Sequence, residues 1–176
     1  MILVINTSGN GIELVLDDKS MHVDGEKQAI ALPVAVNDFM KQNNVQMAEL
    51  TAIGVVVGPG SFTGIRMGIA YAKGLGIGLN IPVIPINIFE LYLYENPDAF
   101  VAIDSGRGDF FVASKFHEPC TMDIDTLETE QMKSPMTVGH KPYNLVFAKN
   151  IVEQKLKDKK IEPVIPMYLR PSYAEK

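Results

Sequence analysis

A glycine-rich loop is the first place in this sequence where residue types and spacing could do chemistry. The stretch from Val55 to Leu75 reads VVVGPGSFTGIRMGIAYAKGL, a β-branched run that enters a glycine loop and opens into a helical pattern. A strand, a glycine loop and a helix together are typical of a phosphate-binding loop, because backbone N–H groups at a helix N-terminus attract anions. Gly58, Gly60 and Ser61 are the residues that would contact such a phosphate.

The loop matches neither of the common phosphate-binding motifs. A P-loop places a lysine directly after its last glycine, whereas Gly64 is followed here by Ile65 and Arg66. A dinucleotide-binding loop requires a third glycine where Thr63 stands, and an acidic residue close to the position of Asn80. The loop can still approach a phosphate through its backbone, but its sequence does not require one.

The helix that follows the loop is unusually rich in small residues. They recur at every fourth position, at Gly64, Gly68, Ala72 and Gly76. A glycine inside a helix costs about 1 kcal/mol relative to alanine, so close approach of another backbone is the expected compensation. Packing against the chain's own sheet is one interpretation. Packing of a second strip, which includes Ile65 and Ile69, against another chain is the other, and spacing leaves both open.

Composition narrows the class of protein. The chain has 176 residues, of which 47% are hydrophobic and 21% charged, and this balance is typical of a soluble globular protein. The net charge of −5 makes it unfavourable for the protein to bind nucleic acid without a partner. Charged residues and prolines interrupt the longest apolar stretch, from Ile65 to Ile86, so we expect no membrane span. We expect a cytoplasmic protein, because no secretory signal is visible and Cys120, the single cysteine, favours a reducing compartment and a structural or surface role.

The pattern of apolar residues predicts an α/β protein. The expected strands are Ile2–Ser8, Gly11–Asp18, a weaker one near Met21–Val23, Leu50–Gly58, Ile81–Ile86 and two within Phe100–Phe116. The expected helices are one that begins at Pro33 and runs through Asn43, then Phe62–Leu79, Asn87–Glu95 and Tyr143–Lys159. We expect mainly turns from Glu118 to Pro142 and an extended tail from Glu162 to Tyr173.

Two parts of the chain begin alike. VINTSGNG near the N-terminus is echoed by AIDSGRGD near residue 104, and each reads as a strand followed by a polar glycine turn. We therefore expect a duplicated α/β domain, with an N-terminal half over residues 1–97 and a C-terminal half over residues 98–176.

The central motif resembles a known family. GPGSFTGIRMGIAYAKGL, with IPVIPIN behind it, is similar to the TsaB (YeaZ) family, and ILVINTS, VAIDSGRGDFF and PMYLRP support the resemblance. The resemblance implies the actin-like ATPase fold in two duplicated α/β halves, the second of them shortened here. It also implies a non-catalytic subunit that supports TsaD in the threonylcarbamoylation of the tRNA adenosine next to the anticodon, with the ATPase TsaE joining a larger complex and tRNA held mainly by the partners.

The resemblance also implies where TsaD would bind. The two N-terminal helices of the family form the interface, which here gives Val36, Phe39, Met40, Ile65, Ile69, Ala72 and Gly76 as partner-binding residues. Replacement Ile69→Arg is accordingly expected to leave the fold intact and abolish TsaD binding. The same helices would form a homodimer in the absence of the partner, and Gly58, Gly60 and Ser61 would contact a nucleotide held at the partner interface.

The residues needed for catalysis are replaced. TsaD-type enzymes carry a V-N-H-x-x-x-H segment whose histidines bind a metal; Asn87 fits its asparagine, but Ile88 and Tyr92 stand at the histidine positions. Asn6 replaces the acidic residue expected on the first strand, and Asp104 remains as a residue that caps a turn. We therefore expect no catalytic residue, metal or cofactor of its own. The alternative is an actin-like enzyme with its own ATPase, kinase-like or metalloprotease activity.

Overall fold

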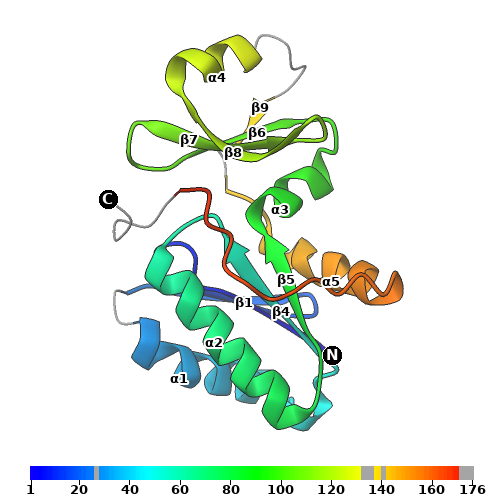
Figure 1. Ribbon diagram of the computed structural model, residues 1–176. Coiled ribbons are helices and arrows are strands. Elements are labelled where there is room, and N and C mark those ends of the chain that lie inside the picture. Colours follow the sequence, from blue (N-terminus) through cyan, green and yellow to red (C-terminus); the bar gives the residue numbers. More distant parts are fainter. Residues whose placement is uncertain (26–27, 132–136, 140–141, 171–176) are drawn as a thin grey trace. The chain divides into compact units, whose positions relative to one another are not determined.

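The computed structural model describes residues 1–25, 28–131, 137–139 and 142–170 (Figure 1). The chain divides into two compact units, the first Met1–Asn87 with Leu145–Pro166 and the second Ile88–Asn144 with Met167–Lys176. This grouping differs from the expected division at residue 97, because the chain returns to the first unit after residue 144. The boundary between two duplicated halves stays a prediction.

The first unit is built on a five-stranded sheet with the order β3-β2-β1-β4-β5. Its strands are β1 (Ile2–Asn6), β2 (Ile12–Leu16), β3 (Lys19–Val23), β4 (Ala52–Gly58) and β5 (Val83–Asn87). Strands β1, β2 and β3 are antiparallel neighbours, whereas β4 runs parallel to both β1 and β5. Every residue of β1 and β4 is buried, which explains their continuous β-branched and aliphatic sequences.

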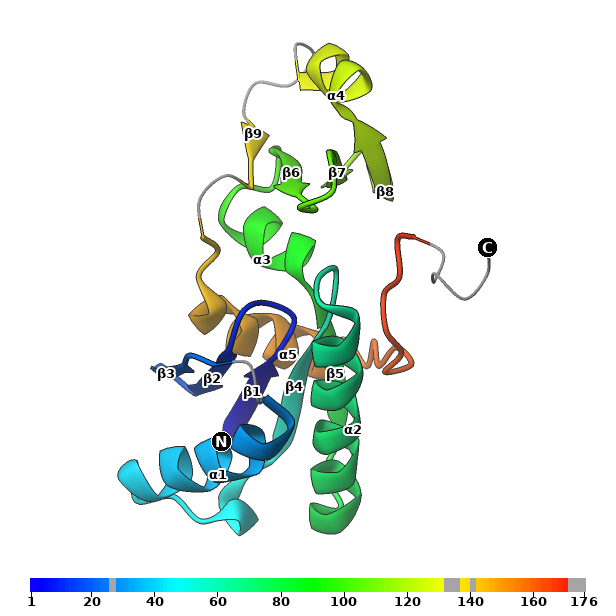
Figure 2. The same cartoon turned by 90° about the vertical axis from the view of Figure 1, so that its left-hand side faces the viewer.

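Three helices cover this sheet: α1 (Gln28–Gln42), α2 (Phe62–Leu79) and α5 (Ala148–Lys157), with short 3₁₀ turns at Met47–Glu49 and Leu145–Phe147. Helices α1 and α2 pack against each other, and α5 packs against β1, β4 and β5 (Figure 2). Gly54 of β4 makes room for α5, since a Cβ there would lie 2.8 Å from a methyl of Val152. Side chains alternate along a strand, so the neighbours of Gly54 in β4 face away from α5.

Helix α1 begins earlier than the sequence pattern predicts. Pro33, expected at the first helical position, lies inside the helix, which starts at Gln28. An internal proline removes one backbone hydrogen bond. The side chain of Gln28 supports the extra turn, because its amide donates hydrogen bonds to the carbonyls of Gly9 and Gly11.

The second unit holds a four-stranded sheet with the order β8-β7-β6-β9. Its elements are α3 (Ile88–Glu95), β6 (Phe100–Asp104), β7 (Asp109–Ser114), β8 (His117–Asp123), α4 (Ile124–Gln131) and β9 (Thr137–Val138). The expectation of mainly turns from Glu118 to Pro142 is wrong over β8, α4 and β9. Within that range residues 132–136, 140 and 141 lie outside the described residues, as do residues 171–173 of the expected extended tail.

The core of the second unit forms between its sheet and α4. Phe100, Ala102, Val112 and Leu127 are buried together, and Phe110, Cys120 and Met122 pack against them half-buried. The thiol of Cys120 is thus part of a hydrophobic cluster, and burial raises its pKa. Of the structural or surface role expected for Cys120, the packing supports the structural one, and the raised pKa disfavours the reactive thiolate.

Of the helices within the described residues, none combines the length and the apolar character that crossing a membrane requires.

Candidate functional site

The glycine loop between β4 and α2 is tied to the end of β1. Gly58 and Gly60 have positive φ angles of 123° and 152°, and the peptide between Gly58 and Pro59 is cis. The N–H of Ser61 donates to the carbonyl oxygen of Ser8 at 2.7 Å. A Cβ on Gly60 would lie 2.3 Å from that same oxygen, so only glycine permits this approach.

The loop also caps helix α2. The hydroxyl oxygen of Ser61 accepts a hydrogen bond from the N–H of Gly64 at 3.2 Å, as an N-cap residue does. The N–H groups of Ser61 and Gly64, which a phosphate-binding loop would offer to a phosphate, therefore donate to other groups of this chain. Gly58 is buried, whereas Gly60 and Ser61 are exposed. Contact of these three residues with a nucleotide stays a prediction.

The turn after β1 contains the buried polar residues of the described chain, Asn6, Thr7 and Ser8. The carbonyl oxygen of the Asn6 side chain accepts from the N–H of Ser8 at 3.0 Å and from its hydroxyl at 2.7 Å. The Asn6 amide donates to a carboxylate oxygen of Glu13 at 2.5 Å, and the two residues are register partners on β1 and β2. Asn6 thus places a neutral amide where ATP-using relatives would have an acidic residue, and both its oxygen and its nitrogen form hydrogen bonds.

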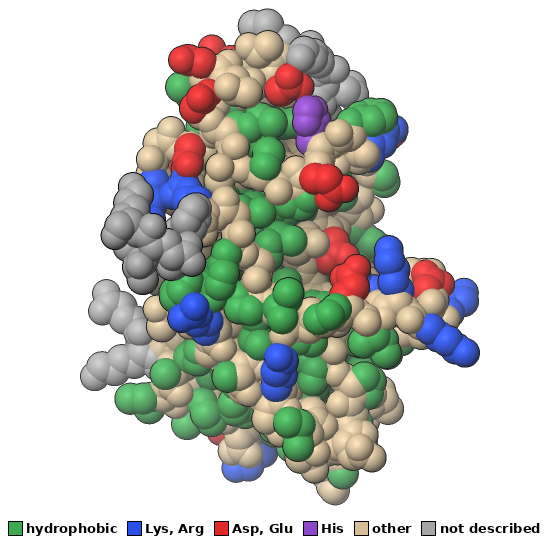
Figure 3. Space-filling model, viewed as in Figure 1, with side chains coloured by type: hydrophobic (Ala, Val, Ile, Leu, Met, Phe, Trp, Pro, Cys, Tyr) green, Lys and Arg blue, Asp and Glu red, His purple; other side chains and the backbone are tan. Residues whose placement is uncertain are grey.

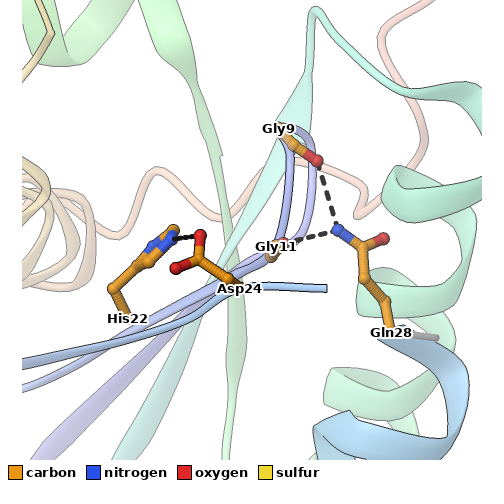
Figure 4. A network of polar contacts seen from close by, with 5 residues as sticks. All are labelled: Gly9, Gly11, His22, Asp24 and Gln28. Atoms are coloured by element: carbon orange, nitrogen blue, oxygen red, sulfur yellow. Dashed lines mark hydrogen bonds and ion pairs between the residues drawn. The ribbon is translucent and has the colours of Figure 1, made fainter. Parts of the chain in front are cut away.

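Gln28 fastens helix α1 to the same turn. Its amide nitrogen donates to the carbonyl of Gly9 at 3.1 Å and to that of Gly11 at 2.5 Å (Figure 4). Beside it, His22 and Asp24 pair at 2.9 Å on the exposed edge strand. Sequence reasoning missed the role of Gln28, because its partners are carbonyls 17 and 19 residues away and no side-chain pattern marks them.

The positions of the TsaD histidines are part of the hydrophobic core. Ile88 and Tyr92 of α3 are both only 7% exposed, and the ring of Tyr92 meets the ring of Tyr143 edge-on at 5.7 Å. Burial raises the pKa of Tyr92, which keeps its hydroxyl protonated. In the described part of the chain no group of three or more His, Cys, Asp or Glu side chains is arranged to hold a metal ion.

Asp104 caps the turn between β6 and β7, as the sequence predicts. One carboxylate oxygen accepts from the N–H of Gly106 at 2.7 Å, so this side chain stabilises the β6–β7 turn.

The glycines of α2 fall into two groups. A Cβ on Gly64 would lie 2.0 Å from the carbonyl oxygen of Thr7, one on Gly68 would lie 2.3 Å from the Thr7 hydroxyl, and one on Gly76 would lie 2.4 Å from Val83. These three glycines therefore serve close packing inside the first unit. Gly74 and Gly78 have nothing within 4 Å of a Cβ and face open space.

The structure places the predicted partner-binding residues in the core of the first unit. Val36, Phe39, Met40, Ile65, Ile69, Ala72 and Gly76 are all buried inside the first unit. The exposed fractions of the six larger ones range from 0% at Val36 to 6% at Ile69, so a partner cannot reach them in this conformation. The reason is that the apolar face of each helix packs against the rest of the first unit. That a partner binds these two helices stays a prediction.

The outward sides of α1 and α2 carry a different apolar set. Ile30 and Val34 of α1 are 73% and 57% exposed, and Phe62 and Ile77 of α2 are 41% and 83% exposed. We call these four residues, with Gly74 and Gly78, the outer helix faces. Figure 3 shows hydrophobic side chains, with Lys and Arg side chains between them, on the surface where Figure 1 draws α1 and α2. The guanidinium of Arg66 stacks over the Phe62 ring at 3.8 Å.

Comparisons with known proteins agree with this arrangement. Residues 25–167 match the model of the family TsaD: tRNA N6-adenosine threonylcarbamoyltransferase. The tRNA threonylcarbamoyladenosine biosynthesis protein TsaB of Haemophilus influenzae is 31% identical over 97 residues, 51% of this chain and 40% of that protein. TsaB of Buchnera aphidicola is 31% identical over 86 residues, 46% of this chain and 39% of that protein. The matches thus span about two fifths of the length of these relatives.

Solved structures share the fold. YeaZ from Pseudomonas aeruginosa aligns with a TM-score of 0.71 over 96% of this chain and 99% of that chain, at 17% sequence identity. A second crystal structure, described as an uncharacterized protein with similarity to peptidase YEAZ from Pseudomonas aeruginosa, gives 0.72 with the same coverage and 16% identity. The expected actin-like α/β fold is confirmed. Because the family model covers most of its residues, the chain belongs to the TsaD family, and the resemblance to its TsaB (YeaZ) members is confirmed.

Proposed function

We propose that this protein is a non-catalytic subunit that supports a TsaD-type enzyme in the threonylcarbamoylation of the tRNA adenosine next to the anticodon. The names of its relatives support a role in this tRNA modification. The observation that carries the proposal is the replacement at the metal-binding positions, where Ile88 and Tyr92 are buried side chains of the core. Among the described residues no group of three or more His, Cys, Asp or Glu side chains is placed to hold a metal ion.

The outer helix faces support a docking role. Four large apolar side chains on two adjacent helices are 41% exposed or more, a density more typical of an interaction surface than of scattered surface residues. Gly74 and Gly78 lie open on α2, so a partner helix can approach the backbone closely there. We assign TsaD to this surface, and a second copy of the chain would cover it when TsaD is absent.

The other parts of the assembly follow from the same proposal. TsaE would join the pair in a larger complex. With a net charge of −5, the chain contributes little to tRNA binding, which the partners would supply, and the complex would work in the cytoplasm. A nucleotide held at the partner interface would meet the exposed backbone of Gly60 and Ser61, next to buried Gly58.

The test is size-exclusion chromatography with light scattering, on the protein alone and mixed with TsaD from the same organism. We expect a stable mixed complex and no ATP turnover by the isolated protein. Modification of tRNA in a reconstituted reaction should depend on adding this protein to TsaD. Absence of a complex at micromolar concentration, or ATP turnover by the isolated chain, would contradict the proposal.

A further inference from the structure

The β6–β7 turn holds the side chain of an arginine that lies 65 residues after Ser105 in the sequence. The guanidinium of Arg170 forms an ion pair with the carboxylate of Asp109 and donates to the hydroxyl of Ser105 at 2.6 Å. It also lies over the ring of Phe111, with its central carbon 5.3 Å from the ring centroid. All four residues belong to the second compact unit, so this contact is internal to that unit.

Hydrogen bonds within the turn fix the groups that face Arg170. The N–H of Ser105 donates to the carbonyl of Asp109 at 3.1 Å, and the Ser105 hydroxyl donates to the Asp109 carboxylate. A carboxylate oxygen of Asp104 accepts from the N–H of Gly106 at 2.7 Å. None of these bonds involves an atom of Arg170. The turn therefore presents a carboxylate and a hydroxyl whose arrangement does not depend on the arginine.

The chemistry of the turn suits a guanidinium better than an ammonium. A guanidinium is planar and can donate to two oxygens while its face lies on an aromatic ring, whereas an ammonium acts as a point charge. Ser105, Asp109 and Phe111 supply these three groups, and we call them the guanidinium site. Two further carboxylates lie at the same end of the sheet, Asp104 on β6 and Asp123, the register partner of Asp109, on β8. Their negative charge favours a cation there.

We propose that the β6–β7 turn is a binding site for a guanidinium group and that Arg170 is its ligand within the chain. The side chains of Arg170 and Asp109 are 24% and 29% exposed, so the pair is largely shielded from water but open to exchange. Arg170 competes with any free guanidinium at an advantage, because it is attached to the same chain and loses little translational freedom on binding. The site would accept the arginine of another molecule only when Arg170 leaves it. This proposal does not depend on the binding of TsaD.

Titration of the full-length Arg170→Ala variant with N-ethylguanidinium tests the site. The amide NMR signals of Ser105 and Gly106 report binding, and sodium chloride keeps the ionic strength constant. We expect a saturable shift with a Kd on the order of 10 mM, since so small a ligand binds weakly. In the wild type the apparent Kd should be at least about tenfold higher, because Arg170 occupies the site. N-ethylammonium should bind Arg170→Ala at least about fivefold more weakly, because it lacks the planar fork.

Further variants separate binding at this site from a general effect of the cation. Adding Asp109→Asn to Arg170→Ala removes the carboxylate and should abolish the saturable shift. Arg170→Gln is a second vacated form that retains an amide donor beside the turn, and N-ethylguanidinium should bind it as well. The matched control Arg66→Ala removes an arginine that stacks on Phe62 in the first unit, and should behave as the wild type does.

Three results would overturn the proposal. The first is the absence of a saturable shift in both Arg170→Ala and Arg170→Gln. The second is an equal Kd in the wild type and in Arg170→Ala, which would place the ligand elsewhere. The third is undiminished binding after Asp109→Asn is added, because the cation would then bind without the carboxylate that defines the site.

Discussion

Gly64 of α2 lies so close to Thr7 of the β1 end that a Cβ on the glycine would fall 2.0 Å from the threonine carbonyl oxygen. The Thr7 hydroxyl in turn donates to the carbonyl of Gly64 at 2.7 Å. A helix and a strand end that are 57 residues apart in sequence are thus joined by a side chain-to-backbone hydrogen bond and by close packing of their backbones. This contact positions the N-terminus of α2, and the glycine loop before it, on the turn that follows β1.

We expect Gly64→Ala to destabilise the first unit by about 1–3 kcal/mol, because the added methyl must displace backbone rather than a flexible side chain. Gly74→Ala is the matched control on the same helix. Its Cβ would meet nothing within 4 Å, so it should stabilise the helix by about 0.5–1 kcal/mol. Urea unfolding followed by circular dichroism measures both. Equal effects of the two substitutions would mean that the Gly64 contact is not tight in solution.

The outer helix faces predict a binding defect without a folding defect. Ile77 is 83% exposed, so Ile77→Arg should leave the melting temperature unchanged and weaken TsaD binding by about 2 kcal/mol if it is a central contact, roughly a 30-fold rise in Kd. Ile161→Arg is the control, since Ile161 is also exposed but lies after α5, outside the outer helix faces. Calorimetric titration with TsaD measures the difference, and equal Kd values for the two variants would remove Ile77 from the interface.

We now expect Ile69→Arg to unfold the protein, whereas the resemblance alone implies a folded variant that does not bind TsaD. Ile69 is 6% exposed, so arginine there would bury an unpaired charge and destabilise the fold by about 3–5 kcal/mol. Loss of soluble folded protein, seen by circular dichroism, is the expected result. A folded Ile69→Arg variant with wild-type stability would show that this side of α2 is accessible after all.

Much of the fold is predictable because its elements obey local rules. Strands β1 and β4 are continuous apolar runs, and α2 begins at a serine cap directly after a glycine loop. The sequence does not reveal the strands and the helix after Phe116, because these elements depend on distant partners. Strand β9 has only the residues Thr137 and Val138 and exists through pairing with β6. Helix α4 has eight residues and buries only Leu127, so too little apolar sequence marks it as a helix.

The sequence predicts which helices would hold the candidate site, but it cannot predict which faces of those helices are exposed. Helix α2 carries isoleucine on both sides, Ile65 inward and Ile77 outward, so its periodicity cannot tell core from surface. The glycines are equally ambiguous, since Gly76 meets Val83 and Gly78 meets nothing. Only the sheet that each helix packs against decides which side remains for a partner.

Replacement of Asn6 by aspartate is expected to lower the stability of the first unit. It is 1% exposed and donates to the carboxylate of Glu13, so Asn6→Asp would place two carboxylates in contact and destabilise the first unit by about 2 kcal/mol at neutral pH. Burial and this repulsion raise the folded-state pKa of the introduced carboxyl. The variant should therefore lie closest to the wild-type stability below about pH 4 and lose stability as pH rises through that raised pKa.

Adding Glu13→Gln to Asn6→Asp should restore most of the stability, because the glutamine amide can donate where the asparagine did. Denaturation at several pH values measures both variants, and neither should gain ATP turnover. A single Asn6→Asp variant as stable as the wild type at pH 7 would contradict the contact.

Helix α4 is expected to depend on Asp123 in a pH-dependent way. The Asp123 carboxylate accepts from the N–H of Thr126 at 2.8 Å, and this backbone hydrogen bond, followed by one from the Thr126 side chain, lowers its pKa. A lowered folded-state pKa means that the cap contributes fully above the unfolded pKa of about 3.9 and is lost as pH falls through the folded value. Asp123→Ala should therefore speed hydrogen exchange in residues 124–131 at neutral pH, whereas Asp123→Asn should keep a cap that no longer titrates.

Asp125→Asn is the matched control, because it removes a neighbouring charge of the first turn without removing the cap. An α4 whose exchange responds equally to Asp125→Asn and Asp123→Ala would show that general charge near the helix N-terminus, rather than this hydrogen bond, sets its stability.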